Sequence, residues 1–176
     1  MDSLITKDQL KAASSYLQGD AAQLDVLIAI VGGLIREYCG WHIAGVETTE
    51  HRLDHDGGNH IELPTMKLRE KPEITINGER ITDFQWSEFG MIQLTKCYAK
   101  GYGTITARMT HGYDSAPEII RAVALSTLAA ALSNPQGATQ VSVGSTSMTT
   151  DAGSGALRLT SYAKGLLGQY CLRNRP

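Results

Sequence analysis

Apolar residues recur at intervals of three and four along four separate segments of the chain, which is the pattern of helices with one buried face. The sequence predicts helices over about residues 6–18, 20–40, 115–133 and 156–172. Capping signals support three of them, and in the second helix Asp20 and Gln23 are placed for such a signal. A Thr-x-x-Gln sequence begins at Thr6, and Ser115 and Glu118 form a Ser-x-x-Glu sequence before the third helix.

Between the second and third predicted helices, apolar residues recur at every second position instead. Residues 43–110 are rich in Thr, Val, Ile and Gly and alternate apolar with polar positions. Asn77-Gly78 predicts a tight hairpin, and residues 56–59 (Asp-Gly-Gly-Asn) predict another. The uncharged residues 139–150 predict a further hairpin or an extended arm. The expected fold is therefore α+β: a single domain made of a helical bundle of about four helices with an inserted small antiparallel β region.

The third predicted helix is apolar around nearly its whole circumference, and no Lys, Arg, Asp or Glu occurs from Ala122 to Thr150. A helix that is apolar on all sides is expected to be buried on all sides. Two interpretations stay open: the β region and the last helix cover it within the chain, or other subunits cover it. The second interpretation gives these candidates for a subunit interface: Ile119, Val123, Leu128, Leu132, Val141 and Val143.

Composition and charge narrow the function classes. The chain has 176 residues, of which 42% are hydrophobic and 19% charged, and its formal net charge is -2. This balance does not indicate a protein held on nucleic acid or on a membrane surface by bulk charge. Cys39, Cys97 and Cys171 lack metal-ligand or redox spacing, so reduced thiols are expected. The sequence predicts no signal peptide and no membrane span.

One group of residues is a candidate metal site. His51, His55 and His60 occur within ten residues, together with Asp54 and Asp56, and such side chains can hold Zn²⁺. On a hairpin His51 and His55 would share a face, but His60 would lie on the other arm. The competing interpretation is an exposed polar hairpin. Because no catalytic or phosphate-binding motif accompanies these residues, we expect no enzymatic activity, no cofactor and no metal, with a metal-binding protein or metal-dependent enzyme as the alternative function.

The order of the motifs along the chain resembles that of a known family. The segment TARMTHGYDSAPEIIRAVAL is followed by NPQG, by QVSVGSTSMTT and by a last helix ending in YCLRNR. DAAQLDVLIA and REYCG precede them. From about Thr6 to Arg173 this order is similar to the head–tail connector (adaptor, or head-completion) proteins of tailed double-stranded DNA phages. The long β insert departs from the smallest members of that family.

The resemblance implies a structural virion protein of the phage neck, made in the host cytoplasm and without enzymatic activity. Monomers would dock as a ring, usually twelve-fold, on the portal protein, extend the DNA channel and contact the next neck (stopper) or tail protein. Packaged DNA would pass through without sequence-specific binding. In the family the C-terminal segment commonly reaches the portal, which implies these portal-contact candidates: Arg158, Tyr170, Arg173 and Arg175. Residues 139–150 are expected to fold or reposition on assembly.

Overall fold

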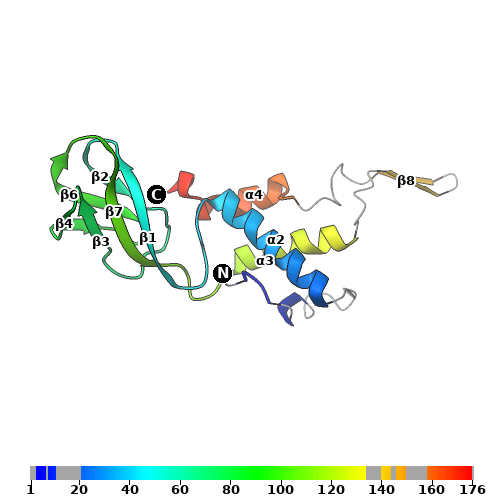
Figure 1. Ribbon diagram of the computed structural model, residues 1–176. Helices are drawn as coiled ribbons and strands as arrows, with labels where there is room; N and C mark the ends of the chain where they lie inside the picture. Colours follow the sequence, from blue (N-terminus) through cyan, green and yellow to red (C-terminus); the bar gives the residue numbers. More distant parts are fainter. Residues whose placement is uncertain are drawn as a thin grey trace. The chain divides into compact units, whose positions relative to one another are not determined.

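The computed structural model describes residues 3–6, 8–10, 21–133, 140–143, 146–149 and 158–175. The chain divides into two compact units. One, here called the helical unit, comprises Met1–Cys39 and Ala116–Gln169. The other, called the β unit, comprises Gly40–Ser115 and Tyr170–Pro176. Figure 1 shows the helices of the first and the strands of the second.

The helices are α2 (Ala21–Cys39), α3 (Glu118–Ser133) and α4 (Ser161–Leu167), followed by the 3-10 turns η1 (Gly168–Tyr170) and η2 (Leu172–Asn174). The strands are β1 (Glu47–His55), β2 (Gly58–Glu62), β3 (Glu73–Ile76), β4 (Glu79–Ile81), β5 (Phe84–Trp86), β6 (Met91–Tyr98), β7 (Gly101–His111), β8 (Gln140–Val143) and β9 (Thr146–Thr149). Among the described helices, none has the length and apolarity needed to cross a membrane.

The β unit consists of two antiparallel sheets with an apolar core between them. The first sheet has the strand order β1-β7-β3-β4 and the second has the order β2-β6-β5. Long strands β1 and β7 pair from Glu47 opposite His111 to His55 opposite Gly101, and Figure 1 shows them side by side. Strand residues of both sheets form the core together with Leu63 and Leu68 from the segment between β2 and β3: Ile61, Leu63, Leu68, Ile74, Ile76, Phe84, Ile92, Leu94, Ile105, Ala107 and Met109.

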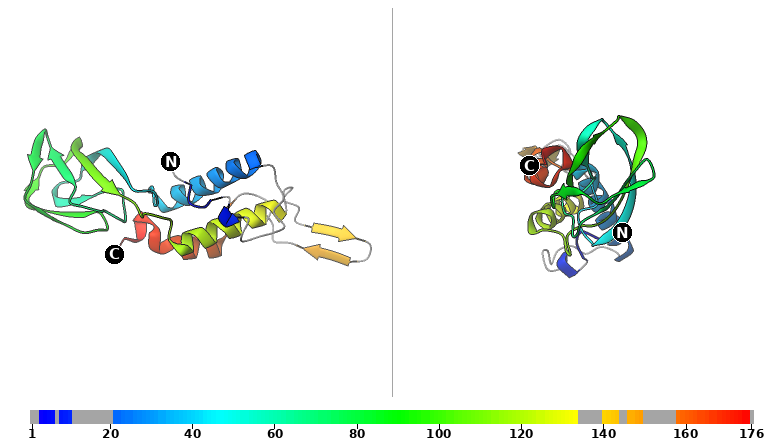
Figure 2. Two further views of the ribbon diagram at one scale, coloured as in Figure 1. Left: turned by 90° about the horizontal axis from the view of Figure 1, so that it is seen from below. Right: turned by 90° about the vertical axis from the view of Figure 1, so that its left-hand side faces the viewer.

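The helical unit is built on the packing of α2 against α3, with α4 against both. Helices α2 and α3 run side by side in opposite directions (Figure 2). Buried residues on α2 include Leu24, Ile28, Val31 and Ile35, whose spacing of three and four places them on one face. The Thr160 side chain caps α4 by accepting a hydrogen bond from the Ala163 amide.

The predicted fold class is wrong. The part of the chain that the structure describes is mostly β, with two antiparallel sheets that contain seven strands in total and with few helices. It is not a bundle of about four helices with a small β insertion. Residues 43–110 form two sheets with a core of their own, because both sheets contribute an apolar face. The last predicted helix is also shorter than its apolar spacing indicated, with α4 covering Ser161–Leu167.

The local signals had mixed outcomes. The Thr6 capping box is confirmed, since Thr6 and Gln9 exchange backbone-to-side-chain hydrogen bonds. The Asn77-Gly78 hairpin is confirmed as the turn between β3 and β4. The hairpin predicted over residues 56–59 is wrong, because β1 and β2 belong to different sheets. Strands β8 and β9 pair with each other as a separate two-stranded antiparallel sheet, and most of the 6–18 prediction lies outside the described residues.

Candidate functional site

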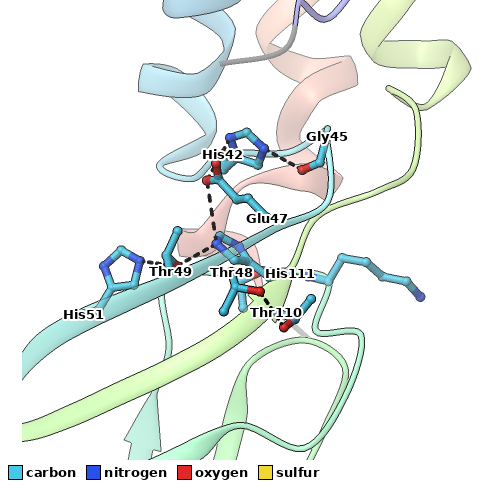
Figure 3. Close-up of polar contacts among 10 residues, drawn as sticks. His42, Gly45, Glu47, Thr48, Thr49, His51, Thr110 and His111 are labelled. Carbon is cyan, nitrogen blue, oxygen red and sulfur yellow. Dashed lines mark hydrogen bonds and ion pairs between the residues drawn. The ribbon is translucent and has the colours of Figure 1, made fainter.

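A cluster of histidines surrounds the first residues of β1 in the β unit. Alternation along the strand places Glu47, Thr49 and His51 on the same face. Antiparallel pairing brings His111, the last residue of β7, opposite Glu47. His42 joins the group from the turn that precedes β1, and Figure 3 shows the side chains turned toward one another.

The Glu47 carboxylate lies between two imidazoles. Its Oε1 is 3.2 Å from His42 Nδ1 and 3.9 Å from His111 Nε2. The other nitrogen of His42, Nε2, is 2.6 Å from the carbonyl oxygen of Gly45. A carbonyl oxygen only accepts hydrogen bonds, so this Nε2 carries a proton. The hydrogen bond to the Gly45 carbonyl therefore fixes the orientation of the His42 ring.

A threonine hydroxyl joins the other two rings. Thr49 Oγ1 is 3.0 Å from His51 Nε2 and 3.0 Å from His111 Nε2. A hydroxyl has one proton, so it can donate to one ring while it accepts from the other. A proton on His111 Nε2 suits both oxygen atoms near it, Thr49 Oγ1 and Glu47 Oε1. The other ring nitrogen, Nδ1, is then an unprotonated acceptor, and it has no hydrogen-bond partner among the described residues. We infer that His111 donates to Thr49 and that Thr49 donates to His51.

His111 is held in its neutral form. Its residue surface is only 2% exposed. The pKa of His111 is lowered from the ordinary 6.5 to about 4, mainly because burial desolvates the ring; Glu47 opposes the shift, and the neighbouring His42 and His51 contribute to it. A proton added to this ring would reside in a buried site with other imidazoles nearby. His111 therefore resists protonation at neutral pH.

The backbone around the cluster is tightly interlocked. Gly112 has φ +105°, and a Cβ on it would lie 2.6 Å from the Gly45 carbonyl oxygen. The amide of Gly45 donates to the Tyr113 carbonyl, and the amide of Tyr113 donates to the Ile43 carbonyl. Ile43 itself is buried with φ +73°, which is strained for a β-branched residue. These contacts tie the segment before β1 to the segment after β7.

The histidines of the alternative metal site do not come together. His51 and His55 share a face of β1 as predicted, but four residues of strand separate them by about 13 Å. His60 is exposed on β2, in the other sheet. His55 is buried, and its Nδ1 accepts a hydrogen bond from the Gly57 amide. In the described part of the chain, no three His, Cys, Asp or Glu side chains are placed to hold a metal ion.

The structure divides the candidate subunit-interface residues. Val123 and Leu128 are buried in the chain itself, so they are not accessible to a neighbour. Ile119 and Leu132 are half-buried on α3. Val141 and Val143 lie on β8.

The candidate portal-contact residues are also divided. Arg158 and Arg173 are exposed. Tyr170 is half-buried, and its carbonyl accepts a 2.7 Å hydrogen bond from the Trp41 indole. The Arg175 side chain is 9% exposed, donates to the Leu63 carbonyl at 2.8 Å and lies 3.6 Å from Glu62. Burial lowers the pKa of Arg175 and Glu62 opposes that shift. Tyr170 and Arg175 thus hold the C-terminal segment on the β unit.

Sequence reasoning missed two surfaces. Val26 and Ile30 on α2 are 58% and 43% exposed, on the side of the helix opposite its buried face. Helix α3 is not buried on all sides, because Ala122, Ser126 and Ala130 are exposed. Val26 and Ile30 lie four residues apart and outside the three- and four-residue spacing of the buried positions on α2. That spacing was the signal in the sequence from which their exposure could have been predicted. The histidine cluster was missed because His42 and His111 meet only through the pairing of β1 with β7.

Comparison with protein-family models and with curated proteins finds no match to this chain.

Proposed function

We propose that the chain is a structural protein of the neck of a tailed phage, which docks as a ring on the portal, extends the DNA channel and connects head to tail. The proposed class of protein comes from the resemblance, described above, between the order of motifs in this chain and that in phage head–tail connector proteins. The helical unit supplies the physical support, because its two long helices expose surfaces that suit contact with other proteins. The β strands occupy more of the chain than the resemblance implies, and the proposal gives them no part in docking.

The observation that carries the proposal is the uncharged outer surface of α2 and α3. From Val26 to Ile35 and from Ala122 to Ser133 neither helix contains a charged residue. Exposed charged side chains normally keep an outer helix face in water, and apolar exposed surface is typical of protein contact sites. A protein that spends part of its life as a free monomer and part in a ring has such surfaces.

The portal contacts are assigned to Arg158 and Arg173, since both are exposed. Tyr170 and Arg175 act inside the chain, by the contacts to Trp41, Leu63 and Glu62 described above. Multiple weak contacts suffice for stable docking, because every subunit of a ring contributes one set and the sets are linked. Individual contacts can then be weak enough to leave the free protein monomeric.

The assignment is tested by binding the purified full chain to immobilised cognate portal rings. The double variant Arg158→Glu/Arg173→Glu is expected to bind at least tenfold more weakly, since it places like or unpaired charges at the contact. Lys100→Glu is the matched control, because Lys100 is an exposed cation between β6 and β7. Equal binding by all three proteins would remove these arginines from the portal interface. Failure of the unaltered chain to bind would contradict the proposed function itself.

A further inference from the structure

Residues 170–175, here called the strap, belong to the β unit, although α4, which precedes them, belongs to the helical unit. The strap is held near both of its ends. The Trp41 indole donates a 2.7 Å hydrogen bond to the Tyr170 carbonyl. At the other end, the Arg175 guanidinium donates a 2.8 Å hydrogen bond to the Leu63 carbonyl. The strap is therefore bound to the β unit by contacts to its own atoms.

The middle of the strap is also close to the β unit. Cys171 is fully buried, and a Cβ on Gly40 would lie 3.7 Å from the Leu172 Cβ. The β-unit residues that receive the strap, here called the seat, are Gly40, Trp41, Glu62, Leu63 and Met91. Because these contacts are made to the strap itself, a strap of the same sequence from a second copy fits the seat equally well.

The seat offsets only part of the cost of burying Arg175. The Arg175 side chain is 9% exposed, and its Nε has no hydrogen-bond partner among the described residues. Its Nη1 lies 3.4 Å from Met91 Sδ, a weak acceptor, and 3.6 Å from the Glu62 carboxylate, whose side chain is 71% exposed. Desolvation offsets much of the attraction in such an incompletely paired site. The strap is therefore bound in a way that allows its release.

The connection between α4 and the strap is a short turn. The boundary between the two units falls between Gln169 and Tyr170, and α4 passes there into the 3-10 turn η1. A 3-10 turn has poorer hydrogen-bond geometry than an α-helix and commonly serves as a connector. A change of backbone angles in η1 therefore redirects the strap and leaves α4 and the seat intact.

From these observations we propose that, on assembly, the strap of one copy occupies the seat of the next copy. Each copy then gives one strap and receives one, so the contact is heterologous and repeats around a closed ring. Exchange replaces contacts within a chain by the same contacts between chains, so concentration decides between the two forms. Free chains keep their own straps, whereas chains held together on a portal ring exchange them. The inference rests on the proposed ring function and names the link between its subunits.

Disulfide trapping in the full chain tests the exchange. The 3.7 Å between a Cβ on Gly40 and the Leu172 Cβ is within the range that a disulfide spans. The background is Cys97→Ser, because Cys97 is exposed. Gly40→Cys/Leu172→Cys is oxidised on portal rings and, separately, as dilute free protein. We expect a ladder of linked chains on the rings and links only within single chains in the dilute sample, with peptide mapping to identify the residues joined.

Gly78→Cys/Leu172→Cys is the matched control. Gly78 has the same φ of +83° as Gly40 but has open space around it, so the backbone strain is similar and no ladder is expected. If Gly40→Cys impairs folding, Glu62→Cys/Arg175→Cys joined by a bis-maleimide linker gives the same readout, because these two side chains lie 3.6 Å apart.

The outcomes separate the exchange from the ring function. Links only within single chains, in a variant that still co-sediments with portal rings, would overturn the exchange and leave the proposed function. An equal ladder from the control would also overturn it. A specific ladder at high concentration from a protein that never binds portal rings would support the exchange and count against the portal role. The internally linked form is expected to leave portal rings at least tenfold faster than its reduced form, and equal rates would contradict the exchange.

Discussion

Acidification should destabilise the β unit through His111. The imidazole is buried and neutral in the folded protein, with its pKa lowered to about 4 from the ordinary 6.5. Between these two values the unfolded chain binds a proton that the folded protein does not. Stability therefore falls as pH falls below 6.5, and the loss is complete once pH passes below about 4.

The magnitude follows from the two pKa values. Between pH 7 and pH 5 the unfolded ring becomes almost fully protonated while the folded ring stays mostly neutral, which costs about 2 kcal/mol of unfolding free energy. Other groups titrate over this range too. The contribution of His111 is therefore isolated as the difference between the unaltered protein and His111→Gln, whose amide can still donate to Thr49.

Urea unfolding followed by tryptophan fluorescence is the appropriate assay. The chain has two tryptophans, Trp41 and Trp86, and both belong to the β unit, so the signal reports on this unit. His111→Gln is expected to lose about 2 kcal/mol less than the unaltered protein between pH 7 and pH 5. His60→Gln, which alters an exposed histidine of the same unit, is expected to behave as the unaltered protein. Equal losses in all three proteins would refute the reasoning about His111.

Two further predictions concern the segments that adjoin this cluster. Gly112→Ala is expected to lower the unfolding free energy of the β unit by about 3 kcal/mol, from positive φ and from overlap with the Gly45 carbonyl. Gly78→Ala, which has positive φ but open space around it, should cost only about 1 kcal/mol in the same urea assay; equal costs would contradict the overlap. Trp41→Phe leaves the Tyr170 carbonyl without its indole donor and should cost about 1–3 kcal/mol while speeding amide exchange in residues 170–175. Trp86→Phe, at an exposed position, should leave that exchange unchanged.

Two local sequence signals predicted local structure correctly. The capping box at Thr6 and the Asn77-Gly78 turn each depend on residues within a few positions of one another, so the sequence contains all the information that they need. Strand pairing is different. The turn signal at residues 56–59 could not reveal that β1 pairs with β7 and β2 with β6, since those partners lie far along the chain. The β region was therefore underestimated.

For the candidate sites, too, local spacing could be predicted from the sequence and contacts between distant segments could not. Sequence spacing placed His51 and His55 on one face of a strand correctly, but it could not bring His42 and His111 together. For α3, hydropathy counted alanines and leucines alike as apolar and so predicted burial on all sides. The structure buries the larger Ile120, Val123 and Leu128 and exposes Ala122 and Ala130. A short side chain places little apolar area in water when it is exposed, so its exposure costs little free energy.

The most direct test of the central claim is sedimentation velocity of the purified full chain, alone and mixed with its cognate portal ring. The account predicts a monomer alone and, in the mixture, a faster-sedimenting complex that contains about one copy of the chain per portal subunit. A chain that sediments at the same rate with and without portal rings, across low and moderate salt, would contradict it.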